Sequence, residues 1–279
     1  YEVLDEVSDS EAPFFLWVHF FEPHEPYRAH PKFNFGTRSI DRYDSEIAFV
    51  DAQVERLLAA LRRRRRPAVV ALTSDHGEAF GEHDSHYHGS TLYEEQIRVP
   101  LFIAAPKLPA RRVHGPAQLA DLTPTLLRLL DVSSPASMDG RDLGPWLVGE
   151  DPAKLSAAFV ELEQRRALVG QRFKLIDDAK RGFAQLYDLR RDPGERQNLV
   201  GRHPERLRAM RRQLLERLAQ RRGAAQPSAE ALLRAGRGGD VGAAQGLARL
   251  ARRGDQQQRR DALELLLALR VRAGRAVFE

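Results

Sequence analysis

The stretch that decides the fold runs Val69-Val70-Ala71-Leu72-Thr73-Ser74-Asp75-His76-Gly77-Glu78 and continues through Gly81-Glu82-His83-Asp84 to His86 and His88. A short apolar run between polar residues is typical of a fully buried strand, so we expect a strand over 69–73. Ligand sites in open α/β sheets lie just beyond the carboxyl ends of such strands. Gly77 supplies the backbone freedom for a tight turn at this point.

The residues of this turn suit a divalent-metal site. Asp75 and His76 would point to opposite faces of a regular strand, so only a turned backbone lets them converge. A carboxylate and an imidazole in one turn make half of a mixed oxygen and nitrogen shell. A single histidine in such a loop is more often a solvent-exposed surface residue than a metal ligand. Four of the nine histidines fall within 13 residues, however, and solvation does not explain that concentration.

Composition narrows the class of protein. The 279 residues contain no cysteine, which excludes disulfides, thiolate metal sites and a cysteine nucleophile in this chain. The longest apolar run, 14–21, is far too short to span a membrane. The net charge is +5, but residues 201–279 hold 18 arginines and 8 acidic residues. The basic charge therefore belongs to the tail. Arginine outnumbers lysine 39 to 5, which we attribute to genome composition, and we expect no nucleic-acid partner.

The order of the elements predicts an α/β domain followed by smaller parts. We expect a central strand over 14–21, a helix over 43–61 and the strand over 69–73, hence a parallel pair with a right-handed crossover. Pro23 and Pro26 hold His24 on a stiff loop at the same sheet edge as Asp75. Further expected elements are a strand over 97–105, a helix over 118–130, an antiparallel meander (158–162, 167–169, 173–176, 185–187) and tail helices (207–218, 229–233, 243–251, 260–269).

Six segments in order carry a family resemblance. They are Pro23-His24-Glu25-Pro26-Tyr27, Thr73-Ser74-Asp75-His76-Gly77-Glu78, Leu92-Tyr93-Glu94-Glu95 with Arg98-Val99-Pro100-Leu101, Asp121-Leu122-Thr123-Pro124-Thr125-Leu126-Leu127, Met138-Asp139-Gly140-Arg141-Asp142-Leu143, and Leu186-Tyr187-Asp188-Leu189 with Asp192-Pro193-Gly194-Glu195 and Asn198-Leu199. Over roughly 14–200 the chain resembles the carboxyl-terminal portion of the sulfatase family, in the alkaline-phosphatase-like superfamily of metal-dependent hydrolases.

The resemblance implies a fold: an α/β sandwich with a mostly parallel central sheet, incomplete in this chain, then a small antiparallel C-terminal subdomain and an α-helical tail. We expect three parts. Residues 1–150 form the partial catalytic domain, 151–203 an antiparallel α+β subdomain, and 204–279 an Arg-rich helical tail of HEAT or TPR type that contacts a protein partner. By resemblance to bacterial and other sulfatases, the location is periplasmic, extracellular or membrane-anchored.

The resemblance also implies roles for single residues. Asp75 and His76 match a metal-ligand pair, and His24 matches a histidine that contacts the reacting group. We expect His24 and His88 to be catalytic, and His24, His86 and His88 to bind substrate. One divalent ion is implied. The family favours Ca²⁺, whereas an imidazole ligand at His76 shifts the preference towards Mn²⁺ or Zn²⁺. The substrate is a sulfated or phosphorylated small molecule or glycan.

Two departures from the family pattern leave alternatives open. The formylglycine nucleophile of sulfatases arises in a Cys/Ser-x-Pro-x-Arg motif, which is absent, because Ser133-Ser134-Pro135-Ala136-Ser137 lacks the arginine. We therefore expect this chain alone to be inactive. The family's lysine is replaced by Gly89, beside His88, which suits a pH-dependent cation. A phosphodiester or phosphonate monoester hydrolase, or a non-catalytic binding protein, remains an alternative. The sequence encoded upstream would discriminate among the three.

Overall fold

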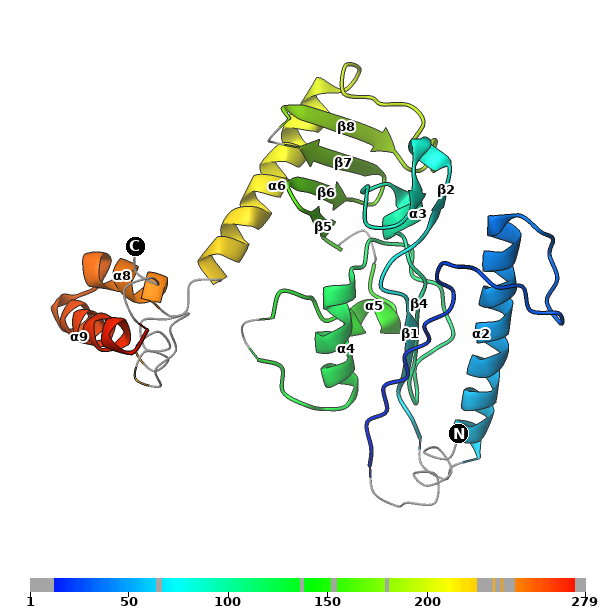
Figure 1. Cartoon of the computed structure of the whole chain (residues 1–279), viewed down its shortest axis with the longest axis horizontal. Helices are drawn as coiled ribbons and strands as arrows, with labels where there is room; N and C mark the ends of the chain where they lie inside the picture. The colour runs from blue at the N-terminus through cyan, green and yellow to red at the C-terminus, as the bar shows by residue number, and fades with distance from the viewer. Residues whose placement is uncertain are drawn as a thin grey trace. The chain divides into compact units, whose positions relative to one another are not determined.

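The computed structural model describes residues 13–63, 67–135, 138–151, 155–178, 181–224, 233, 237 and 244–273 (Figure 1). The chain divides into two compact units, residues 1–210 and 211–279. Among the described residues, no helix is both long and apolar enough to cross a membrane. The predicted boundaries after residues 150 and 203 remain predictions.

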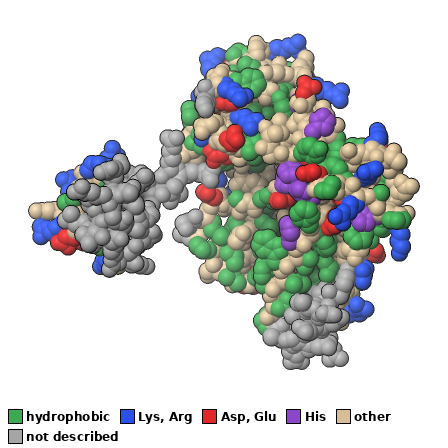
Figure 2. Space-filling model, viewed as in Figure 1, with side chains coloured by type: hydrophobic (Ala, Val, Ile, Leu, Met, Phe, Trp, Pro, Cys, Tyr) green, Lys and Arg blue, Asp and Glu red, His purple; other side chains and the backbone are tan. Residues whose placement is uncertain are grey.

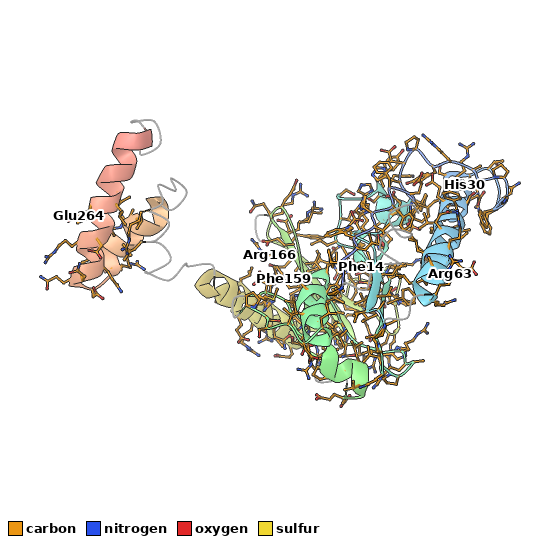
Figure 3. The ribbon with its side chains drawn as sticks, turned by 90° about the horizontal axis from the view of Figure 1, so that it is seen from below. Phe14, His30, Arg63, Phe159, Arg166 and Glu264 are labelled. Atoms are coloured by element: carbon orange, nitrogen blue, oxygen red, sulfur yellow. The ribbon has the colours of Figure 1, made fainter. Side chains whose placement is uncertain are left out.

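Helix α2 spans Ser39–Arg62 and confirms the helix predicted over 43–61. Its first turn is fixed by the side chain of Arg38, which lies 2.7 Å from the carboxylate of Asp41. Hydrogen bonding to Arg38 holds the pKa of Asp41 below its usual range. A carboxylate in the first turn also complements the helix dipole. Figure 3 shows His30 near one end of this helix and Arg63 at the other.

The decisive strand forms, but its partner is not the predicted one. Strand β1 (Val70–Thr73) pairs antiparallel with β4 (Leu101–Ala104), and Thr73 lies opposite Leu101. The residues of β1 are half-buried rather than fully buried. The strand predicted over 97–105 begins only after Pro100, which cannot donate a ladder hydrogen bond. Residues 94–97 form the short helix α3 (Glu94–Ile97) instead.

The predicted strand over 14–21, and with it the parallel pair, is wrong for the described residues. The segment forms no strand ladder, and its aromatic side chains are exposed, Phe15 by 82% and Trp17 by 78%. An apolar run becomes a strand only when a neighbour accepts and donates the backbone hydrogen bonds. The neighbour that β1 finds among the described residues is β4.

The excursion between β1 and β4 carries the site. It contains the two-stranded hairpin β2 (Ala79–Phe80) and β3 (His86–Tyr87), with the 3₁₀ turn η1 (Glu82–Asp84) between the strands. The segment after β4 forms η2 (Leu119–Asp121), α4 (Leu122–Leu129) and α5 (Gly144–Val148). Together η2 and α4 confirm the helix predicted over 118–130.

A buried ion pair fixes η2 and α4. The Asp121 side chain is fully buried and lies 2.5 Å from the guanidinium of Arg141. The same carboxylate accepts the backbone N–H of Arg141 at 2.8 Å. Thr125 donates to the Asp121 carbonyl at 2.6 Å and accepts the N–H of Leu143 at 2.9 Å. These bonds explain why two of the quoted motifs, 121–127 and 138–143, occur together.

The antiparallel meander is confirmed. Its four strands pair in chain order, β5-β6-β7-β8. They are Ala158–Leu162, Arg165–Val169, Phe173–Asp178 and Phe183–Asp188. Ala167, Ile176 and Tyr187 form one buried face of this sheet, and Leu92 packs with them. The meander thereby anchors the segment that leads from the site to α3.

Helix α6 (Pro204–Ala224) follows the sheet, as Figure 1 shows, and the Arg206 guanidinium lies 4.9 Å over the Phe173 ring. In the second unit, α8 (Ala244–Arg253) and α9 (Gln256–Ala273) form a hairpin around the buried Leu247 and Ala262. The predicted tail helices over 207–218, 243–251 and 260–269 are therefore present. Most of the one predicted over 229–233 lies outside the described residues. The HEAT or TPR assignment stays a prediction.

Candidate functional site

The turn after β1 brings Asp75 and His76 together. The Asp75 carboxylate accepts the backbone N–H of His76 at 3.0 Å, and the hydroxyl of Ser74 donates to the His76 carbonyl at 2.8 Å. His76 Nδ1 donates to the carbonyl of Gly77 at 2.9 Å, which leaves Nε2 as the free nitrogen of the ring. That nitrogen lies 3.7 Å from Asp75 Oδ2. The turn thus aims one oxygen and one nitrogen at a common point.

Three imidazoles lie together beside this turn. The rings of His76 and His88 stack with centroids 3.8 Å apart, and the ring of His24 meets His88 edge-on at 5.2 Å. His24 Nδ1 donates to the Glu25 carbonyl at 2.7 Å, so its Nε2 is also left free. Figure 2 shows histidine side chains gathered next to acidic ones on one face of the molecule. Residues 64 positions apart in sequence therefore meet at one site.

Helix α2 holds the loop that carries His24. Glu46 accepts the backbone N–H of Arg28 at 2.8 Å, and Ser45 accepts that of His30 at 2.8 Å. The side chains of Ser45 and Glu46 are buried, each 1% exposed. Two adjacent helix residues thus fix the loop a few residues beyond His24.

A buried carboxylate lies under the histidines. The side chain of Glu78 is 3% exposed; one oxygen lies 3.2 Å from Nδ1 of His88, which donates to it, and the other accepts the hydroxyl of Tyr27 at 2.7 Å. Burial, together with the hydrogen bond to Glu78, raises the pKa of Tyr27 well above its usual value. Tyr27 therefore stays a hydrogen-bond donor, and His88 is oriented with Nδ1 inwards.

His83 connects this loop to the antiparallel sheet instead of joining the other histidines. Its Nδ1 lies 2.8 Å from a carboxylate oxygen of Glu95, and its Nε2 lies 3.1 Å from the carbonyl of Glu195. Burial lowers the pKa of His83, but the hydrogen bonds to Glu95 and Glu195 outweigh that effect and raise it overall. Both ring nitrogens face acceptors, so the imidazolium form satisfies both. The His83 ring also stacks on Tyr93 at 3.6 Å.

A buried lysine strengthens the same connection. Lys174 on β7 is fully buried, and its ammonium lies 3.0 Å from Glu94 and 2.9 Å from the fully buried Glu195. The other oxygen of Glu195 accepts the backbone N–H of Glu94 at 2.6 Å. Burial raises the pKa of Glu195 despite the neighbouring ammonium. The residue pairs of this joint are 80 and 101 positions apart in sequence.

The donor atoms at Asp75 and His76 fit a divalent ion. Ligands bound about 2.0–2.2 Å from a metal lie at separations near that of Asp75 Oδ2 and His76 Nε2. The hydrogen bond at Nδ1 of His76 is the outer contact that metal-bound histidines usually make. Among the described residues, however, no group of three or more acidic, histidine or cysteine side chains is arranged to hold an ion. The pair would supply two ligands of a larger set.

The structure thus brings together four of the five predicted site residues, namely Asp75, His76, His24 and His88. His86 is the exception. Its side chain is exposed in β3, and its ring lies 6.5 Å from that of Tyr87. The contacts of the described residues do not link His86 to the other histidines, so its substrate-binding role stays a prediction. Tyr27 and Glu78 each stand inside a quoted motif, but their hydrogen bond to each other and the contact of Glu78 with His88 were not predicted from the sequence.

Comparisons with known proteins identify the family and the fold of the chain. Residues 1–132 match the family model described as Sulfatase, and residues 81–224 match the one described as N-sulphoglucosamine sulphohydrolase, C-terminal. The uncharacterized sulfatase YidJ of Escherichia coli is 32% identical over 162 residues, which are 54% of this chain and 32% of that protein. The chain therefore spans about a third of the length of that relative.

Two solved structures show the same fold. The 2-O GAG sulfatase BT1596 has a TM-score of 0.54 and 28% identity, over 66% of this chain and 43% of its own. The phosphonate monoester hydrolase of Silicibacter pomeroyi has a TM-score of 0.57 and 27% identity, over 65% and 41%. These likenesses confirm the predicted alkaline-phosphatase-like α/β class. The N-sulphoglucosamine sulphohydrolase, C-terminal, model covers just over half of the chain, and together with the Sulfatase model it shows that the chain belongs to the sulfatase family.

Proposed function

We propose that this chain carries part of the active site of a metal-dependent sulfuric ester hydrolase. The observation that carries the proposal is the convergence at the end of β1, where Asp75 Oδ2 and His76 Nε2 lie 3.7 Å apart and the ring of His88 stacks on His76. We infer that Asp75 and His76 are the metal-ligand pair, with the rings of His88 and His24 beside them. Hydrolysis of a charged ester requires these groups to act at one point.

Each residue has a proposed task. Asp75 and His76 hold the ion, for which Mn²⁺ or Zn²⁺ suits the imidazole ligand and Ca²⁺ follows from the family. When bound, the ion polarises an oxygen of the ester group. Nε2 of His24 and Nε2 of His88 are left to face the remaining ester oxygens, because Nδ1 of each ring is already hydrogen-bonded; a ring donates to such an oxygen only when both of its nitrogens carry a proton.

The nucleophile is not assigned to a residue of this chain. The sequence holds neither a cysteine nor a Ser-x-Pro-x-Arg motif. We therefore propose that residues 1–279 alone hydrolyse neither sulfate nor phosphate esters. The kinetic tests therefore use the protein as its gene encodes it.

A phosphonate monoester hydrolase is the second candidate. Its support is the replacement of the family's lysine by Gly89 beside His88, together with the likeness to the Silicibacter pomeroyi enzyme. The histidine cluster suits either substrate, because both esters place negative oxygens next to the reacting atom.

The test compares an aryl sulfate with an aryl phosphonate monoester, each assayed with Ca²⁺, Mn²⁺ or Zn²⁺. We expect faster turnover of the sulfate, and loss of that turnover in His24→Ala and His88→Ala. His114→Ala, a substitution outside the site, is the matched control. Preference for the phosphonate would replace the first candidate by the second. Turnover of neither ester in the metal-loaded protein would favour the non-catalytic binding role.

A further inference from the structure

The loop that carries His88 is closed by one buried amide. The side chain of Gln96, in α3, is 3% exposed, and its Oε1 accepts the backbone N–H groups of Ser90 and Thr91, both at 3.0 Å. Because backbone N–H groups can only donate, these bonds fix the orientation of the amide. Its Nε2 therefore donates to the hydroxyl oxygens of Ser85 and Ser90, at 2.9 and 3.0 Å.

The tip of this loop is tightly folded. Residues 86–89 lie between Ser85 and Ser90, whose hydroxyl oxygens are 2.9 Å apart. Within the tip, Tyr87 has φ of 65° and Gly89 has φ of 71°. A left-handed backbone is unfavourable for a tyrosine and persists only where surrounding contacts impose it. The ring of bonds around Gln96 supplies those contacts at both ends of the tip.

The same residue also holds the metal-ligand turn. The backbone carbonyl of Gln96 accepts the N–H of Gly77 at 2.8 Å. The backbone at Gly77 and the backbone at Glu95 approach so closely that a Cβ at Gly77 would lie 2.2 Å from the carbonyl oxygen of Glu95. The turn that bears Asp75 and His76 is thus fastened to the backbone of Gln96, and the loop that bears His88 is fastened to its side chain.

We propose that Gln96 is a positioning residue that keeps His88 in register with the Asp75–His76 pair. It contacts neither imidazole and acts only through the two segments that it joins. Its kinetic consequence rests on the proposed function, whereas the placement of His88 is measurable without any activity.

The first test measures placement directly. In the protein as encoded, we expect the stacking of His76 on His88 to shift the ring-proton resonances of both upfield, and each set is assigned by its disappearance in His76→Asn or His88→Asn. In Gln96→Leu, which removes every hydrogen bond of this side chain, we expect the His88 ring protons to lose that shift. Gln96→Glu keeps the acceptor for the Ser90 and Thr91 N–H groups, and the two serine hydroxyls, which accept from the amide in the wild type, can turn to donate to the second carboxylate oxygen, so this variant should retain the shift. Gln197→Leu, at an exposed position, is the matched control.

The second test measures the reaction. Gln96→Leu should lower kcat on the order of 10- to 100-fold, as a displacement of about 1 Å does. KM and bound metal should stay near wild type, because the carbonyl that holds Gly77 remains. If Gln96→Leu fails to fold, the double variant Ser85→Ala/Ser90→Ala removes only the two serine hydroxyls that contact the amide. It should lower kcat as well, but by less than Gln96→Leu.

Unchanged His88 resonances in a folded Gln96→Leu protein would overturn the proposal, as would an equal loss in Gln96→Glu. Absence of hydrolysis in the wild-type protein would overturn the proposed function instead and would leave the resonance test decisive for Gln96.

Discussion

Replacing Lys174 by methionine should destabilise the first unit strongly. Lys174 and Glu195 are both fully buried, with 2.9 Å between ammonium and carboxylate, and Glu94 lies 3.0 Å from the same ammonium. Removing one partner of a buried ion pair leaves an uncompensated charge in the protein interior. That loss costs about 3–5 kcal/mol. We expect Lys174→Met to lower the free energy of unfolding by this amount.

The stability loss in Lys174→Met should also depend on pH, which provides a second, independent test of the same prediction. Burial already raises the pKa of Glu195 in the wild type, and loss of the ammonium raises it further. A carboxyl group whose pKa is higher in the folded than in the unfolded state favours folding when protonated. Its penalty therefore grows as pH rises through the folded pKa. Lys174→Met should lose less stability at pH 5 than at pH 7.5.

The assay is urea unfolding followed by tryptophan fluorescence. The chain has two tryptophans, Trp17 and Trp146, and both lie in the unit of residues 1–210, so the signal reports that unit alone. The double variant Lys174→Met/Glu195→Gln removes both charges and keeps an acceptor for the Glu94 N–H, so it should be clearly more stable than Lys174→Met. If Lys174→Met lowers the free energy of unfolding by less than about 1 kcal/mol, the reasoning is refuted, because disrupting a solvent-exposed ion pair costs no more than that. So would a double variant no more stable than the single one.

Two further predictions concern the segments around the site. His83 has a raised pKa because it donates to Glu95 and Glu195, so its contribution to stability is fully present below its unfolded pKa of about 6.5 and is lost as pH rises through the folded pKa. The difference in unfolding free energy between wild type and His83→Gln should therefore be larger at pH 6 than at pH 9, and equal differences would contradict the assignment. Gly77→Ala places a Cβ 2.2 Å from the Glu95 carbonyl oxygen and should cost about 1–3 kcal/mol together with part of the metal affinity. Isothermal titration with Mn²⁺ measures that affinity, and wild-type binding would show that the turn does not need its close approach to α3.

Local patterns in the sequence predicted the elements that depend on local interactions. The alternating strands between residues 158 and 188 and the helix α2 follow from periodicity and short turns, and both are present. The turn at Asp75 and His76 was likewise predicted from a strand end next to Gly77, but Gly77 does not adopt a left-handed φ. A glycine is needed there because a Cβ would lie 2.2 Å from the carbonyl oxygen of Glu95. The placement of His24 at the same edge as Asp75 was predicted from two strand ends, although only one of those strands forms among the described residues, and the contact of His24 with His88 was not predicted.

Contacts between segments that are distant in the sequence could not be predicted from it. The choice of β4 as the partner of β1 depends on which segment returns alongside it, and residues 14–21 looked equally suited by composition. The joint of Lys174, Glu94 and Glu195 links residues up to 101 positions apart, and no local pattern encodes it. Gln96 carries no chemical signature of its own. Its role follows from the hydrogen bonds that its buried amide makes and from the one that its backbone carbonyl accepts from Gly77.

The most direct test of the central claim is the metal content of the protein as encoded. We would purify the wild type, Asp75→Ala, His76→Ala and the control His83→Gln, and measure bound Ca²⁺, Mn²⁺ and Zn²⁺ by mass spectrometry alongside turnover of an aryl sulfate. The account predicts a bound ion in the wild type and the control, and loss of both metal and turnover in Asp75→Ala and His76→Ala. Metal content unchanged in a folded Asp75→Ala protein would contradict it.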